Sequence, residues 1–98
     1  MEAAMKPYHA FHVGVELDIF RWVVIDGEGY MEDYPMAIEC FVEWPVGGMR
    51  SEMNVHIDYA RTTNDVPLPN ELRFTPDELY LIKEMAMDAA ESEAENDL

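Results

Sequence analysis

The chain has 98 residues, of which 21 are acidic and 6 are basic, so its formal net charge at pH 7 is −15. The length suits one domain over residues 1–98, and the aromatic content of 11% excludes an unfolded acidic chain, which would be poor in aromatics. Because such a charge repels nucleic acid and anionic membranes, we expect neither as a direct partner and expect basic protein surfaces to be attracted instead.

The first half of the chain is predicted to form strands. Residues 1–7 are expected to be a loose tail, followed by a β-meander over residues 8–60. Apolar and polar residues alternate from Tyr8 to Ile19, as in a half-buried strand. The apolar run 20–25 continues without a turn signal, so we interpret it as the same strand bending through a bulge, with a tight turn near residues 18–21 as the alternative.

Two further strands are predicted after a loop. Residues 26–35, DGEGYMEDYP, have the composition of a loop, and residues 36–44 alternate again. A hairpin connection at 45–49 with two glycines leads into residues 50–60, whose apolar positions recur at every second residue. Residues 61–74 are predicted to be a loop crossing toward a helix.

A C-terminal helix is predicted over residues 75–93. Thr75 is a good N-cap, Pro76 suits the first helical position, and Glu78 completes a capping box. The apolar stripe then recurs every three or four residues. Residues 94–98 are expected to fray as an acidic tail, because carboxylates are unfavourable at a helix C-terminus.

This order predicts a two-layer α+β fold. An antiparallel meander of three or four strands would be covered on one face by the C-terminal helix. No apolar run reaches the roughly 20 residues that cross a bilayer, the N-terminus lacks the apolar segment of a secretory signal, and a single cysteine excludes an internal disulfide. We therefore expect a cytoplasmic protein.

Residues that could carry chemistry are few. His9 and His12 would point to opposite faces of a strand, and His56 is interpreted as a surface histidine, although a metal pocket on the polar face remains an alternative. Cys40 falls in the inward set and is expected to be inert. The 26–35 stretch lacks the spacing of a calcium loop. We predict no catalytic residue, no metal site and no cofactor, and hence a protein that is not an enzyme.

The acids are the most informative feature. On the outward face of the sheet we place Glu16, Asp18, Glu39, Glu43, Glu52 and Asp58, and on the helix Glu84, Asp88 and Glu91. Adjacent rows of carboxylates on neighbouring strands can approach the charge density of a nucleic-acid strand. We therefore expect these residues, with Phe41 as an apolar anchor, to bind a basic nucleic-acid-binding protein or complex.

An apolar patch is also expected on the outward face. Phe20 and Tyr34 are predicted to join Phe41 there, and a homodimer through this patch or through a sheet edge is the alternative function, that of a structural or assembly adaptor. A second alternative is that the 26–35 loop covers Phe41.

The segment LRFTPDELYLIKEMAMDAAESEAENDL, an acidic terminal helix closing a small meander, resembles the small acidic proteins that bacteriophages encode. These include anti-CRISPR and anti-restriction proteins that imitate nucleic acid. The resemblance implies an inhibitor of a host defence complex. It assigns no role to any single residue.

Overall fold

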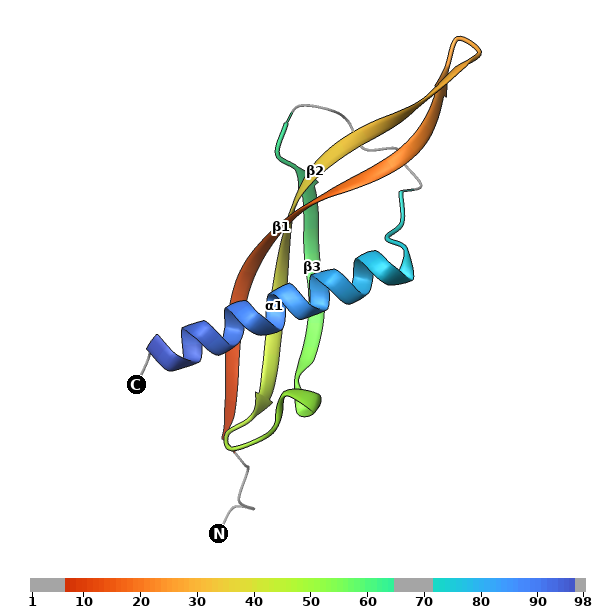
Figure 1. The fold of residues 1–98 in the computed structure, drawn as a ribbon. Coiled ribbons are helices and arrows are strands. Elements are labelled where there is room, and N and C mark those ends of the chain that lie inside the picture. The colour runs from red at the N-terminus through yellow and green to blue at the C-terminus, as the bar shows by residue number, and fades with distance from the viewer. Residues whose placement is uncertain (1–6, 65–71, 97–98) are drawn as a thin grey trace.

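The computed structural model describes residues 7–64 and 72–96, which form a three-stranded antiparallel sheet and one helix (Figure 1). The strands β1 (Tyr8–Ile25), β2 (Glu28–Pro45) and β3 (Asn54–Thr62) lie in the order β1-β2-β3. A single 3-10 turn, η1 (Arg50–Glu52), precedes β3, and the helix α1 (Pro76–Asn96) crosses one face of the sheet. The predicted two-layer α+β fold is confirmed.

The prediction of a loop at residues 26–35 is wrong. β1 and β2 are joined by the two-residue turn Asp26–Gly27, with Ile25 paired to Glu28. Both turn residues have positive φ, 53° and 81°, as expected of an Asp-Gly hairpin turn that follows the twist of its strands. Residues 28–35 therefore lengthen β2, and they do not cover Phe41.

β1 is one continuous strand, as preferred from the sequence, but it has no bulge. Its pairing with β2 runs in unbroken register from Tyr8↔Pro45 to Ile25↔Glu28. Among the described residues β1 pairs only with β2, so its outer edge has no strand beside it.

The irregularity in the sheet lies between β2 and β3. Cys40 pairs with Ile57, but Glu39 pairs with Tyr59, so Asp58 is an extra residue on β3. Beyond this bulge the side-chain alternation reverses. The alternation predicts that Tyr59 points to the same side as Ile57, but Tyr59 is 58% exposed on the side of the sheet turned away from α1. Ala60 packs against the core instead.

The core lies between the sheet and α1. Ile82, Ala86 and Ala90 of α1 are fully buried, and small alanines let the helix approach the sheet closely. The sheet contributes alternate residues of β1 and β2 to this cluster: Val13, Val15, Ile19, Tyr34, Met36, Ile38, Cys40, Val42 and Trp44. We call the opposite side of the sheet, turned away from α1, the outer face.

The start of α1 is capped as predicted. The Thr75 backbone N–H donates to Glu78 Oε1 over 2.8 Å, and the Glu78 N–H donates to Thr75 Oγ1 over 3.2 Å, which completes the capping box. The helix continues to Asn96, three residues past the predicted end at 93. Residues 1–6 of the predicted tail 1–7, residues 65–71 of the predicted loop 61–74 and residues 97–98 of the predicted tail 94–98 lie outside the described residues.

The molecule is elongated, with extents of 67 × 25 × 20 Å, because the β1–β2 hairpin continues beyond the other elements (Figure 1). The pairing of β2 with β3 ends at Met36↔Thr62, so residues farther along the hairpin form a ribbon of two strands. We call residues 20–33 the arm.

Candidate protein-interaction surface

The structure divides the predicted acidic site between two layers. Glu16 and Asp18 on β1 and Glu39 and Glu43 on β2 occupy outer-face positions of the register. Glu84, Asp88 and Glu91 lie on α1, which packs against the other face. The predicted set is therefore not one continuous surface.

The centre of the outer face is a row of three rings across the three strands. His12, Phe41 and His56 are register partners, and the Phe41 ring centroid lies 4.9 Å from that of His12 and 6.4 Å from that of His56. Because the two histidines flank it, Phe41 is only partly exposed.

Each of these histidines also approaches a carboxylate. His12 Nδ1 lies 3.9 Å from Asp58 Oδ2, and His56 Nε2 lies 3.7 Å from Glu43 Oε1. Asp58 lies at the bulge of β3, and its carboxylate therefore reaches over β2 toward His12 of β1. The result is an aromatic centre with carboxylates on both sides.

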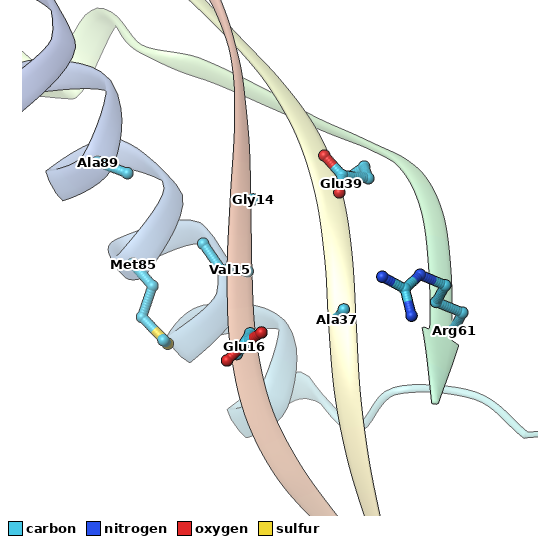
Figure 2. Close-up of a pocket in the computed structure, with 8 residues that line it drawn as sticks. All are labelled: Gly14, Val15, Glu16, Ala37, Glu39, Arg61, Met85 and Ala89. Atoms are coloured by element: carbon cyan, nitrogen blue, oxygen red, sulfur yellow. The ribbon is translucent and has the colours of Figure 1, made fainter. Parts of the chain in front are cut away.

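A shallow hollow adjoins this centre at the free edge of β1. Glu16, Glu39 and Arg61 come from the three neighbouring strands, and the small residues Gly14 and Ala37 lie between them (Figure 2). Val15, Met85 and Ala89 line the same hollow from the helix side of β1. Because its lining comes from all three strands and from both sides of β1, the hollow is open and is not an enclosed cleft.

The helix acids have a structural role that the sequence did not reveal. Arg50 of η1 binds the carboxylates of Glu84 and Glu91 and contacts Asp88 at 2.8 Å. Hydrogen bonding to these acids raises the pKa of Arg50, and the bond from Arg50 lowers the pKa of Glu84. One arginine thus fastens the turn before β3 to α1. The recurrence of acids at positions 84, 88 and 91, one helix face, was the available signal.

Glu52 lies apart from both groups. It belongs to η1, and its side chain folds back toward its own turn, where Oε1 lies 3.5 Å from the Met49 backbone nitrogen. The nine predicted acids therefore fall into an outer-face group with Asp58, an Arg50-bound group, and this single residue.

Several exposed apolar side chains lie on the arm, and of these Phe20 was predicted to join the outer-face patch. Phe20, Trp22, Val24 and Met31 occupy outer-face positions and are 54%, 65%, 63% and 58% exposed. Tyr34, which was predicted to join Phe20 and Phe41, is instead buried in the core at 4% exposure. The row of Phe41 and the row of Phe20 are eight residues apart along β1, about 26 Å.

The remaining candidates for chemistry do not converge. Cys40 is 1% exposed, and burial, with smaller contributions from Asp58 and Glu39, raises its pKa to about 11. No group of three or more metal-ligating side chains occurs within residues 7–64 and 72–96. No helix in the described part of the chain is long and apolar enough to cross a membrane.

Comparison of the chain with models of protein families, with curated proteins and with solved structures finds no match.

Proposed function

We propose that this protein is a non-enzymatic binding protein whose outer face occupies the basic surface with which a larger protein holds nucleic acid. The observation that supports this most is the concentration of carboxylates around an aromatic centre on a face that no described element covers. Those carboxylates are Glu16, Asp18, Glu39, Glu43 and Asp58.

The arrangement suits occlusion better than catalysis. The strands hold the Cα atoms of these residues at fixed spacings of about 6.6 Å along a strand and 4.8 Å between strands, so little backbone freedom is lost on binding. Lys and Arg side chains placed to bind phosphates would meet carboxylates instead. The net charge of −15 adds a long-range attraction that speeds association and weakens in salt.

The resemblance suggests an inhibitor of the anti-CRISPR or anti-restriction type, which a phage would make and which would act in the host cytoplasm. Its mechanism would be steric and electrostatic exclusion of nucleic acid. It requires no cofactor and no metal.

The test is a pull-down from host lysate, followed by displacement with DNA or RNA. The variant Glu16→Gln/Asp18→Asn/Glu39→Gln should lose the captured protein, whereas Asp77→Asn/Glu93→Gln/Glu95→Gln, with the same charge change on α1, should retain it. Wild-type capture should fail in high salt and in excess nucleic acid. Equal loss in both variants, or capture that nucleic acid does not displace, contradicts occlusion by the outer face.

A second candidate function, a self-associating adaptor, is favoured by the exposed apolar side of the arm. Sedimentation at low and high salt separates the two, because an apolar dimer persists where an electrostatic complex dissociates.

A further inference from the structure

The outer side of the arm is a continuous apolar surface. Trp22 pairs with Met31 across the ribbon, Phe20 and Val24 lie two positions from Trp22 on the same side, and each of the four is more than half exposed. Monomeric proteins rarely leave several large apolar side chains together in water without a binding role.

The arm holds this surface in a defined orientation. On its other side, Arg21 binds Glu78 with two contacts of 2.5 and 2.7 Å and donates to the Arg73 carbonyl over 2.8 Å. Ile19 and Tyr34 are buried in the core at its base. The fold therefore fastens one side of the arm to α1 and leaves the apolar side open.

Trp22 is also positioned within the arm. A Cβ at Gly29 would lie 2.2 Å from Trp22 Cζ2, so the indole occupies the space that any larger residue at position 29 would need. A tryptophan that is already placed loses less freedom on binding, and tryptophan is among the residues that contribute most to interface affinity.

The charges around this surface indicate what it binds. The arm carries four carboxylates, Asp26, Glu28, Glu32 and Asp33, and its single basic residue, Arg21, is already paired with Glu78. A second copy would bring two such acidic rims and two charges of −15 together. A partner with basic residues beside an apolar surface is complementary instead.

We propose that the arm is the apolar anchor of the interface and that it binds an apolar groove edged with Lys and Arg on the same partner protein. This rests on the proposed function and refines it, because the anchor moves from Phe41 to Trp22 and Met31. The outer-face carboxylates provide attraction and orientation, and the arm provides most of the lifetime of the complex.

The probes are three short labelled peptides: one alternates Lys with Leu, one alternates Lys with Ser, and one alternates Glu with Leu. Fluorescence anisotropy should show that the Lys–Leu peptide binds most tightly, and Trp22 emission should shift to shorter wavelength as the indole is buried. Trp44 is only 6% exposed before binding, so its emission gives a constant background. Trp22→Ala should weaken binding at least about tenfold.

Two matched pairs separate the arm from general effects. Met31→Ala should weaken binding, whereas Met49→Ala, which removes a methionine that is 69% exposed and lies outside the arm, should not. Gly29→Ala should weaken binding by displacing the Trp22 indole, whereas in a Trp22→Ala background the same change should have little further effect, because no indole remains to be displaced. Circular dichroism confirms that each variant is folded.

The outcomes test the arm as anchor separately from the proposed electrostatic function. Equal binding of the Lys–Leu and Lys–Ser peptides with unchanged Trp22 emission overturns the arm as anchor but leaves the electrostatic function standing. Failure of both basic peptides to bind overturns both. A dimer in sedimentation that Trp22→Ala converts to monomer shows that a second copy occupies the arm, and this also overturns the inference.

Discussion

Glu78 joins the arm to α1, and replacing it by glutamine isolates the contribution of its charge to the stability of the fold. Its carboxylate accepts two hydrogen bonds from Arg21 of the arm and one from the Thr75 N–H of the capping box. Glutamine keeps one oxygen, which can still accept from the Thr75 N–H and from one Arg21 N–H, but it loses the second acceptor and the ion pair. The pair is partly shielded, with 23% of the Arg21 side chain and 16% of the Glu78 side chain exposed.

The magnitude follows from that shielding. Exposed ion pairs contribute about 0.2–1 kcal/mol, and hydrogen bonds to charged groups about 1.5–3 kcal/mol. For a partly shielded pair that retains some bonds in the variant, we expect Glu78→Gln to lower the free energy of unfolding by about 1 kcal/mol. Glu78→Ala also loses the capping box, so its cost should be about 2 kcal/mol.

The effect should depend on pH in a defined direction. The bond from Arg21, together with those from Thr75, lowers the pKa of Glu78, so the unfolded chain binds the proton more readily than the folded one. The stabilisation is therefore complete above the unfolded pKa of about 4.3 and is lost as the pH falls through the lower pKa of the folded protein. Wild type and Glu78→Gln should converge in acid.

Urea unfolding followed by tryptophan fluorescence measures this difference. At pH 7 the midpoint of Glu78→Gln should fall by about 0.5–1 M. Asp77→Asn, which removes a neighbouring charge with no arginine contact, should cost only a few tenths of a kcal/mol. If Glu78→Gln costs as much in an Arg21→Met background as in the wild type, or costs the same at every pH, the ion pair does not stabilise the fold.

Two further predictions concern the core. Ile82→Ala should destabilise by about 2–5 kcal/mol in the same urea assay, because Ile82 is fully buried between α1 and the sheet, whereas Leu81→Ala at 50% exposure should cost much less; similar costs would mean that α1 does not pack as described. Cys40 should resist iodoacetamide at pH 8 in the folded protein and react in urea, since the thiol is buried and its pKa is raised to about 11; rapid modification without unfolding would contradict this burial.

The sequence predicted the elements well where a local signal is strong. Alternation placed Val13, Val15, Ile38 and Val42 on the inward face, and the Thr75–Glu78 pattern located the start of α1. The Asp26–Gly27 turn also had a recognisable signal, but the acidic and glycine-rich composition around it was interpreted as a longer loop.

Other features depend on contacts that no local pattern records. Nothing within β3 marks Asp58 as a bulge, so the reversal that exposes Tyr59 was not predicted. The pairing of Arg50 with the helix acids joins residues more than thirty positions apart. Charge counts alone could not separate these structural acids from Glu39, which stays free for a partner's side chains in the proposed function.

The acidity of the chain also bears on how the exposed edge of β1 behaves when two molecules meet. β1 is 18 residues long, and in the part of the chain that the structure describes no strand pairs with its outer edge. Such edges favour the association of one molecule with another. Mutual repulsion between highly charged copies opposes that stacking, and it disappears near the isoelectric point of about 4.2. The carboxylates thus oppose association through this edge, and in the proposed function the same side chains also bind the partner.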